Sequence, residues 1–355
     1  MKNILHINGA GTQAFTLSNF ERELGYNSDV LSYRENLYKF SSASYNYKLP
    51  HSISEISFIQ SVKTISEIAN LLILARNHYD IIHFYGGHTV FPLSQRVNII
   101  NNIFYGFDVN LYKNKKIYIH YQGCEIRSRE DDNLMCLKCS DNSCDSKKGV
   151  LKQRRVEKME SFSPIFTYST PDLKKYLPKE SIYFPQIIPE ETKVTRKHNL
   201  DKSKIKIIHA PTNSEKKGTD LIITAINELI SEGLNIELKL IQNMTHSELL
   251  NIAYESDFAI DQVLSGWYGR FGVEMLSKGI PTFNYINESY LLQENIEDCP
   301  ILKVDPKDLK NSIRGYLTKY INSPHLYKEK VLESQIYYEK THNVANVADR
   351  ITVSY

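Results

Sequence analysis

The stretch 257-DFAIDQVLSGWYGRFGVEMLSKGIPTFNY-285 decides how the rest of this 355-residue chain is interpreted. Short runs of β-branched and aromatic residues predict strands at 257–261 and 280–285. Between them, a loop with three glycines leads into an amphipathic pattern over 271–278, which predicts a helix. A strand, a loop, a helix and a second strand are the repeating parts of a parallel sheet with right-handed crossovers.

The same alternation runs along most of the sequence. Further strands are predicted at 2–7, 29–33, 79–85, 115–122, 164–169, 204–210 and 236–242. Helices are predicted at 56–77, 149–161, 218–232, 246–255 and 306–320, with a last helical region at about 323–350. The predicted fold class is therefore α/β, with two Rossmann-like doubly wound domains facing a cleft.

A change of composition marks the boundary between the two domains. In 185-PQIIPEETKVTRKHNLDKSK-204, two prolines precede a polar stretch and a new strand, which predicts a linker. We expect an N-terminal domain over 1–187, a C-terminal domain over 188–330, and a C-terminal helix over 331–355 that is able to return to the N-terminal domain.

Charge and hydropathy exclude several functional classes. Residues 1–190 contain 23 Lys+Arg and 19 Asp+Glu, a net charge of +4, and the remainder has a net charge of −2. No basic run has the length or aromatic interleaving that a nucleic-acid binder needs, so no nucleic-acid partner is expected. The small basic excess leaves peripheral association with an anionic membrane open.

The N-terminal sequence and the apolar runs predict where the protein resides. The first residues, MKNILHINGAGTQ, lack the features of a secretory signal, and apolar runs such as 71-LLILA-75 are too short to span a bilayer. We expect a cytoplasmic protein, peripheral at most on the inner face of the membrane.

The segment 205-IKIIHAPTNSEKKGTDLIITAINELI-230 combines a strand, a polar loop and a helix that begins near Gly218 or Thr219. A helix start presents N–H groups and the positive end of a dipole, which suit an anion such as a diphosphate. Lys216 and Lys217 directly precede it and would add positive charge. A solvated basic pair before a helix is the alternative interpretation.

The loop over 261–274 offers a complementary set of groups. Gly269 and Gly272 would allow a close ligand approach or a positive φ. Glu274 is predicted in the first turn of the next helix, where a carboxylate can accept hydrogen bonds from a ligand diol. Arg270 would neutralise phosphate, and Trp267 or Tyr268 would stack on a base or sugar. Helix capping by Glu274 and simple burial of Trp267 are the alternatives.

These two segments together resemble the donor-binding domain of GT-B glycosyltransferases, particularly retaining family 4-like enzymes. That family has a Lys-Gly pair at the start of one helix, matched by Lys217 and Gly218, and an EGFG…EAMACGxPV block whose end is matched by 271-FGVEMLSKGIP-281. The resemblance implies that Lys217 binds the diphosphate of a nucleotide-sugar and that Glu274 holds the ribose hydroxyls.

The resemblance also implies a wider donor-binding set and a catalytic subset. The expected catalytic residues are Lys217, Glu274 and Arg270. The expected donor-binding residues are Lys216, Lys217, Gly218, Thr219, Asp261, Trp267, Gly269, Arg270, Phe271, Gly272 and Glu274.

The chain departs from the family pattern at two donor-side positions. Gly266 stands where the family has the first glutamate of its pair, and Thr212 stands where it has an arginine. Asp261 and Arg270 are the candidates to take over sugar placement and phosphate neutralisation.

Three loops of the N-terminal half are candidates for the acceptor side: 8-NGAGTQAFTLSNFEREL-24, 84-FYGGHTVFP-92 and 117-IYIHYQGCEIRSR-129. The first and third resemble the family's acceptor side, and the second follows a predicted strand and is expected to place His88 at the edge of the cleft. The third matches a family strand that ends in HG(S/T)D(V/I)R, with Gln122 in place of the histidine. Glutamine cannot act as a general base, although it can hydrogen-bond a sugar hydroxyl. The acceptor-side candidates are Gly9, Gly11, His88, Gln122 and Glu125.

Four cysteines fall within 21 residues, in the loop 124–144. A C-x-x-C pair beside two further cysteines suits tetrahedral thiolate ligation, which makes structural zinc the main candidate. Unligated thiols and an iron–sulfur cluster are the alternatives. The residues concerned are Cys124, Cys136, Cys139 and Cys144.

The expected function is that of a hexosyltransferase-type enzyme (EC 2.4), which transfers a sugar from a nucleotide-sugar to a glycan, lipid-linked or protein acceptor with retention of configuration. No cofactor is required for catalysis if the leaving diphosphate takes the acceptor's proton. Two alternatives stay open: a catalytically silent GT-B scaffold that binds a nucleotide-sugar or a partner protein, and a sugar-nucleotide epimerase.

Overall fold

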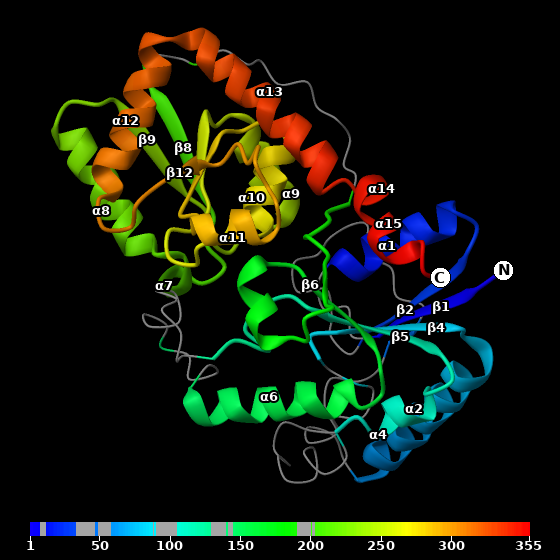
Figure 1. Cartoon of the computed structure of the whole chain (residues 1–355). Coiled ribbons are helices and arrows are strands. Elements are labelled where there is room, and N and C mark those ends of the chain that lie inside the picture. The colour runs from blue at the N-terminus through cyan, green and yellow to red at the C-terminus, as the bar shows by residue number, and fades with distance from the viewer. Residues whose placement is uncertain are drawn as a thin grey trace. The chain divides into compact units, whose positions relative to one another are not determined.

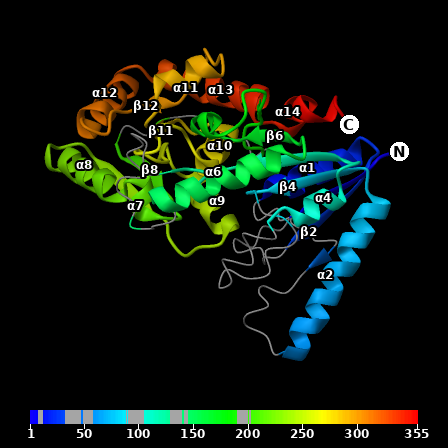
Figure 2. The same ribbon diagram turned by 60° about the horizontal axis from the view of Figure 1, so that its bottom comes forward.

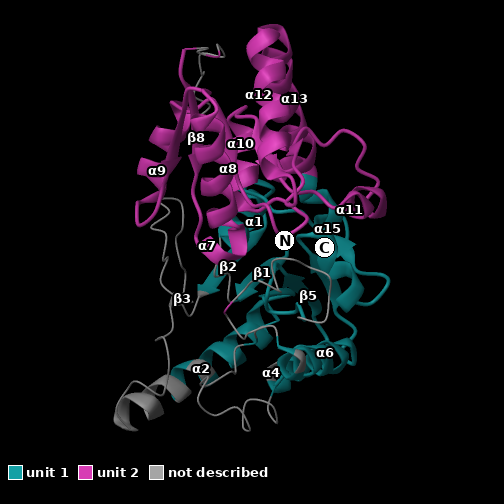
Figure 3. Ribbon diagram, turned by 90° about the vertical axis from the view of Figure 1, so that its left-hand side faces the viewer, with its two compact units in different colours: residues 1–128, 145–189, 347–355 teal, residues 129–144, 190–346 magenta. Residues whose placement is uncertain are grey.

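The computed structural model forms two compact units, each built on its own parallel sheet (Figures 1 and 3). Unit 1 comprises residues 1–128, 145–189 and 347–355, and unit 2 comprises residues 129–144 and 190–346. The structure describes residues 1–7, 12–32, 47–48, 58–87, 89, 105–128, 140, 145–189, 200 and 203–355. The predicted α/β class with two Rossmann-like units is confirmed.

The division between the units differs slightly from the predicted domains. The chain passes from unit 1 to unit 2 at 189/190, two residues after the predicted boundary. Helix α13 (Pro324–Thr341) stays in unit 2, because Tyr327 packs edge-on against Phe258 and its hydroxyl donates to the carbonyl of Asp257 at 2.8 Å. Only residues 347–355, rather than all of 331–355, group with unit 1.

The sheet of unit 1 has the strand order β3-β2-β1-β4-β5-β6-β7, with every neighbouring pair parallel. The order reverses between β1 and β4, as in a doubly wound sheet. The strands are β1 (Asn3–Ile7), β2 (Asn27–Ser32), β3 (Tyr47–Lys48), β4 (Ile81–Tyr85), β5 (Lys116–Tyr121), β6 (Ile165–Tyr168) and β7 (Ile182–Tyr183).

Helices cover both faces of this sheet (Figures 1 and 2). Helices α2, α4 and α6 lie on one face and α1 and α15 on the other. The helices of this unit are α1 (Thr12–Glu23), α2 (Phe58–His78), α4 (Phe107–Leu111), α6 (Ser146–Glu160), the 3-10 helix η3 (Pro171–Tyr176) and α15 (Asp349–Thr352), while α14 (Val344–Val347) ends where the chain re-enters it.

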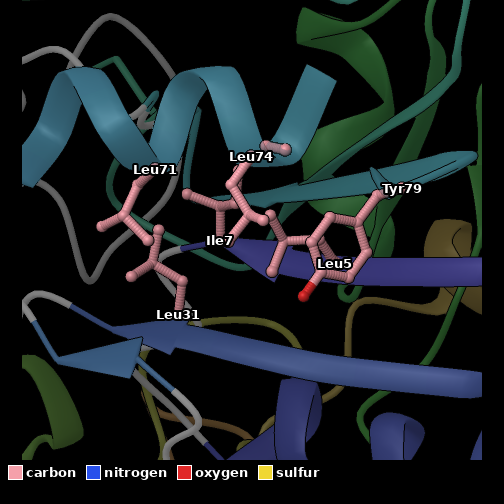
Figure 4. Close-up of a pocket in the computed structure, with 7 residues that line it drawn as sticks. Leu5, Ile7, Leu31, Leu71, Leu74 and Tyr79 are labelled. Atoms are coloured by element: carbon pink, nitrogen blue, oxygen red, sulfur yellow. The ribbon is translucent and has the colours of Figure 1, made fainter. Parts of the chain in front are cut away.

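Successive side chains of β1 point to opposite faces of the sheet, so this strand contributes to the packing on both faces. Leu5 and Ile7 point toward α2, where they line an apolar pocket with Leu31, Leu74 and Tyr79 (Figure 4). Such a lining offers almost no polar group to orient a ligand, so this pocket belongs to the core rather than to a functional site.

On the opposite face, the centre of the sheet is polar and buried. His6 Nε2 lies 2.7 Å from Glu21 Oε2, and the ring of His6 stacks on that of His83. The chain's last residue enters this network, because the hydroxyl of Tyr355 donates to Glu21 Oε1 at 2.5 Å and lies 2.9 Å from His83 Nε2. Paired polar groups thus connect residues 347–355 to the sheet of unit 1.

The sheet of unit 2 has the order β12-β11-β10-β8-β9, and all its neighbours are parallel. Its strands are β8 (Ile205–His209), β9 (Ile236–Leu240), β10 (Phe258–Ile260), β11 (Thr282–Asn284) and β12 (Leu302–Lys303). Besides α13, its helices are α7 (Ser214–Lys217), α8 (Thr219–Ser231), α9 (His246–Tyr254), α10 (Arg270–Ser277), α11 (Glu288–Gln293) and α12 (Leu309–Asn322).

Helices α9 and α10 cover one face of this sheet, while α8 and α12 cover the other (Figure 1). A continuous apolar cluster joins the first pair of helices to β8 and β10. It contains Ile208, Ile241, Ala253, Ala259, Phe271, Met275 and Ile280. This packing fixes the start of α10 at the carboxyl ends of the central strands.

Candidate functional site

The strand order of unit 2 reverses between β8 and β10, since β9 flanks β8 on one side and β11 flanks β10 on the other. The loops that leave the carboxyl ends of β8 and β10 therefore diverge, and open α/β sheets bind ligands at such switch points. One loop leads into α7 and α8, and the other runs over 261–269 into α10. Both predicted donor segments thus meet in unit 2.

A glycine allows these two loops to touch. Gly218 ends α7 and precedes α8 with a φ of +77°, in the left-handed region. A Cβ at this position would lie 2.6 Å from Val263 Cγ2, and the N–H of Val263 donates to the carbonyl of Lys217 at 3.1 Å. Glycine is required at position 218 because the backbone has a positive φ and because a Cβ would collide with Val263.

Lys217 forms an ion pair with Asp261, the residue directly after β10. Asp261 is 1% exposed, and its second oxygen, Oδ2, accepts a hydrogen bond from the N–H of Gly269 at 2.5 Å. Lys217 ends α7, one residue before the Gly218 that precedes α8. Its carboxylate partner was not predicted from the sequence.

The glycines at 269 and 272 serve this ion pair by leaving room for it. A Cβ on Gly272 would lie 2.9 Å from Asp261 Oδ2, and a Cβ on Gly269 would lie 3.1 Å from Lys217 Nζ. Gly269 has a φ of −98° and Gly272 lies inside α10, so neither glycine adopts a positive φ, the second of the two predicted roles. Both positions require glycine because the carboxylate of Asp261 lies close to the backbone there.

Glu274 lies in the second turn of α10 rather than the first, because the helix already begins at Arg270. Its Oε1 accepts hydrogen bonds from Arg270 Nε at 2.8 Å and from His246 Nε2 at 3.1 Å. Burial acts to raise the pKa of Glu274, but the hydrogen bond from His246 and the charge of Arg270 outweigh it and lower the pKa. These two neighbours, rather than the helix dipole, keep the carboxylate ionised.

The other oxygen of Glu274 is left available. Of the residues that the structure describes, none donates a hydrogen bond to Glu274 Oε2. The residue as a whole is only 5% exposed. A buried carboxylate with one oxygen held and one open is suited to accept a hydrogen bond from a hydroxyl group.

His209 connects the two central strands below this site. Its Nδ1–H donates to the carbonyl of Ile260 at 2.8 Å, and its Nε2 accepts from the hydroxyl of Thr219, 3.0 Å away. Both ring nitrogens are satisfied in the neutral form, and burial lowers the pKa of His209 to about 4. Thr219, a predicted donor-binding residue, therefore uses its side chain to hold the start of α8.

Other predicted donor-side residues lie in the core or beside the loops. The ring of Trp267 stacks on that of Tyr268 with centroids 4.8 Å apart, and both residues are buried. Their faces are covered by protein, which favours the burial alternative over stacking on a base. Phe271 belongs to the apolar cluster under α10, and Lys216 is half-buried with its N–H donating to Asn213 Oδ1 at 2.9 Å.

Gly266 shows why the family's first glutamate has no counterpart here. Its φ is +74°, and a Cβ would lie 3.2 Å from the ring of Tyr290. A side chain at this position would be strained as well as crowded. The backbone conformation of this loop therefore requires glycine at position 266, where the family has a glutamate.

In unit 1, the acceptor-side candidates that the structure describes take part in local contacts. Gln122 Nε2 donates to Gln13 Oε1 at 3.0 Å. Glu125 Oε1 accepts from the N–H groups of Gln122 and Gly123, so this carboxylate caps its own turn. Gly9, Gly11 and His88 lie outside the described residues.

The cysteine loop falls largely outside the described residues as well, since Cys136, Cys139 and Cys144 are not among them. Cys124 is described, and its Sγ lies 3.9 Å from Arg127 Nη1. The described part of the chain contains no group of three or more His, Cys, Asp or Glu side chains placed to hold a metal. Structural zinc stays a prediction.

The sequence pattern predicts a helix that begins at His246 but indicates no role for this residue in the site. A local signal was present in 245-THSE-248, which has the spacing of a capping box. The structure contains that box, with the side chain of Thr245 accepting from the N–H of Glu248. A residue at the first position of a helix after a parallel strand lies at the ligand-binding edge of the sheet.

Within the described ranges, none of the helices is both long and apolar enough to cross a lipid bilayer.

No protein-family model matches the chain, and no curated protein matches its sequence. Solved structures do match it. Sucrose-phosphate synthase from Thermosynechococcus elongatus aligns with 100% of this chain and 98% of its own, with a TM-score of 0.63 and 12% identity. An alpha-glucosyltransferase in complex with UDP-glucose and DNA containing an abasic site aligns with 98% of this chain and 97% of its own, with a TM-score of 0.56 and 10% identity.

A third structure is the catalytic domain of starch synthase IV from Arabidopsis thaliana bound to ADP and acarbose. It covers 94% of this chain and 95% of its own, with a TM-score of 0.56 and 11% identity. Identities this low over nearly complete chains show a common fold. The chain therefore has the GT-B fold of these glycosyltransferases, as the resemblance of its donor segments implied.

Proposed function

We propose that this protein is a glycosyltransferase that binds a nucleoside diphosphate sugar at the switch point of unit 2. The observation that carries this proposal is the state of Glu274: a buried carboxylate with a lowered pKa, held through Oε1, while none of the described residues donates to its Oε2. A ribose hydroxyl is a fitting donor for the open oxygen. The two structures of this fold described above that contain a nucleotide are named with UDP-glucose and with ADP.

The diphosphate would lie at the head of α8. The N–H groups of the first turn of α8 and the ammonium of Lys217 stabilise negative charge there. In transfer with retention, the leaving diphosphate accepts the acceptor's proton, and the protein contributes positioning and charge stabilisation. Lys217, Glu274 and Arg270 are the residues to which we assign these tasks. The acceptor is a glycan, a lipid-linked precursor or a protein.

The charges of the site also support a second candidate function, a scaffold that binds a nucleotide-sugar without transferring sugar. Lys217 is paired with Asp261, and Arg270 with Glu274, so these four side chains contribute no net charge. Attraction for a diphosphate must then come mainly from the backbone N–H groups of α8 and α10. A silent scaffold that binds a nucleotide-sugar or a partner protein without transferring sugar is the second candidate function.

Calorimetric titration with UDP-, GDP-, ADP- and CDP-linked sugars tests the donor site. We expect one nucleotide class to bind the wild type, and Glu274→Gln to weaken that binding at least tenfold, because a charge-assisted hydrogen bond is lost. Glu297→Gln removes an equal charge from an exposed residue of the same unit and should leave the Kd unchanged. Failure of all four classes to bind would overturn the proposal.

A donor-turnover assay then separates the candidate functions. Slow hydrolysis of the bound donor, or transfer to an added acceptor, supports the glycosyltransferase. Conversion of the free donor to its epimer supports an epimerase instead. Tight binding with neither reaction supports the scaffold.

We also propose that unit 1 meets an anionic membrane through helix α6. The helix carries six basic and two acidic residues, a net +4 that equals the net charge of all residues 1–190. Lys147, Arg154 and Lys158 recur at helical spacing on one exposed face, together with half-buried Leu151 and with Val150, which is 53% exposed. Cations interleaved with apolar side chains suit anionic headgroups, where a lipid-linked acceptor would lie.

A further inference from the structure

His246 and Arg270 bind the same oxygen of Glu274 from two different helices. Arg270 lies one turn before Glu274 in α10, whereas His246 is the first residue of α9. Their donor atoms are 2.8 and 3.1 Å from Oε1. Side chains from two separate elements therefore converge on one atom, and none of the described residues donates to its twin, Oε2.

The backbone of His246 is fixed by the preceding cap. The side chain of Thr245 accepts from the N–H of Glu248, and Glu248 Oε2 accepts from the N–H of Thr245 at 2.8 Å. This reciprocal capping box sets the direction in which α9 starts. The backbone that carries the imidazole is therefore set before any ligand arrives.

The chemistry of the contact fixes the tautomer of the ring. An ionised carboxylate can only accept hydrogen bonds, so Nε2 of His246 must carry the proton that points at Glu274. The side chains of His246 and Glu274 are 13% and 7% exposed. A charge-assisted hydrogen bond in such a buried place is stronger than one in water.

Two donors on one oxygen restrict the carboxylate more than either does alone. With Arg270 only, the carboxylate could turn about its last torsion, which is broad for a glutamate. With His246 added from a second helix, that torsion is set and Oε2 has one direction. Fixing a binding group in advance removes an ordering cost from ligand binding.

We infer that His246 is a positioning residue of the donor site, which holds Glu274 Oε1 together with Arg270 so that Oε2 receives a ribose hydroxyl of the nucleotide. The inference rests on the proposed function and extends it to a residue outside the resemblance. His246 acts through Glu274 and does not itself contact the nucleotide.

The test is calorimetric titration of UDP, GDP, ADP and CDP into the full chain, using the nucleotide that binds best. We expect His246→Ala to raise its Kd about tenfold, in line with the loss of a charge-assisted hydrogen bond. His246→Gln should restore most of the affinity, because its amide donates from a similar position without an imidazole. His325→Ala, at an exposed histidine of the same unit, is the matched control.

A double-mutant cycle separates positioning from general destabilisation. In a Glu274→Ala background, His246→Ala should have almost no further effect on Kd, because there is no carboxylate left to position. Additive losses, or no rescue by His246→Gln, would overturn the positioning role. Should His246→Ala fail to fold, His246→Met keeps the volume without the donor and takes its place in the comparison.

The outcomes also separate this inference from the proposed function. If the wild type binds a nucleotide, Glu274→Ala raises the Kd measurably and His246→Ala does not change it, the donor site stands and the role of His246 is refuted. If the wild type binds none of the four nucleotides, both are refuted.

Discussion

The ion pair between Lys217 and Asp261 is buried at the switch point of unit 2. Asp261 is 1% exposed and Lys217 is its only cationic partner among the described residues. A buried charge without a partner is expensive, whereas a paired one is tolerated. The pair therefore has a structural task in addition to the binding role proposed for Lys217.

We predict that Lys217→Ala destabilises unit 2 by about 3 kcal/mol, because it leaves the carboxylate of Asp261 buried and uncompensated. Removing both charges in Lys217→Met/Asp261→Asn should recover at least half of that loss. Trp267, the single tryptophan of the chain, is buried in unit 2, so its fluorescence during urea unfolding reports the free energy. A double variant no more stable than Lys217→Ala would contradict this account.

Two helical glycines provide a second test at the scale of single residues. A Cβ on Gly272 would collide with Asp261 Oδ2, whereas a Cβ on Gly315 in α12 meets nothing within 4 Å. We predict that Gly272→Ala destabilises unit 2 by about 1–3 kcal/mol through crowding. Gly315→Ala should stabilise it by about 0.5–1 kcal/mol through reduced backbone freedom of the unfolded chain. Effects of the same sign in urea unfolding would refute the steric explanation.

At the scale of elements, the position of each helix start decides what its side chains do. Helix α10 begins at Arg270, one residue before the predicted start, and that shift moves Glu274 from the first turn to the second. Its carboxylate then lies one turn beyond Arg270, where an i,i+4 pair forms. The same helix start brings Glu274 within reach of His246 on α9.

Helix α6 carries the element-scale prediction for membrane association. We expect the triple variant Lys147→Gln/Arg154→Gln/Lys158→Gln to bind vesicles containing phosphatidylserine about 100-fold more weakly, because each basic residue contributes about 1 kcal/mol near an anionic surface. Vesicle sedimentation measures the bound fraction. The control Lys307→Gln/Lys319→Gln/Lys328→Gln removes three exposed cations from unit 2. Equal loss in both triples, or equal binding to neutral vesicles, would refute α6 as the docking face.

At the scale of the whole molecule, buried neutral histidines couple both units to pH. Burial lowers the pKa of His209 in unit 2 to about 4 and that of His120 in unit 1 to about 3, and it lowers the pKa of His83 well below 6.5. In the unfolded chain these rings take up a proton as the pH falls through about 6.5. The unfolded state therefore binds more protons between pH 6.5 and 4, so folding stability falls as the pH falls across that window.

For unit 2, this predicts a loss of roughly 2 kcal/mol from His209 alone between pH 7.5 and pH 5.0. Urea unfolding followed by Trp267 fluorescence at the two pH values measures it. The difference should shrink by about that amount in His209→Gln and stay unchanged in His325→Gln, whose histidine is exposed in the wild type. Equal pH dependence in wild type and His209→Gln would contradict the assignment.

Long, regular elements were predictable, and very short ones were not. The main strands and helices of both units lie within a few residues of their predicted ranges, because hydrophobic periodicity needs several residues to be visible. Strands β7 and β12 have only two residues each, and α7 has four, so no period can be read in them. Their positions follow from neighbouring strands and caps.

Local sequence patterns are sufficient to predict the α/β class, the succession of strands and helices, and the two loops of unit 2 that meet at its switch point. These features depend on local patterns and on the rules of parallel sheets, which act along the chain. The partners of the charged side chains become visible in the folded chain: Asp261 for Lys217, and His246 with Arg270 for Glu274. Lys217 and Asp261 are 44 residues apart, and His246 and Glu274 are 28 apart. Contacts at such separations are set by how strands and helices pack, which no local pattern records.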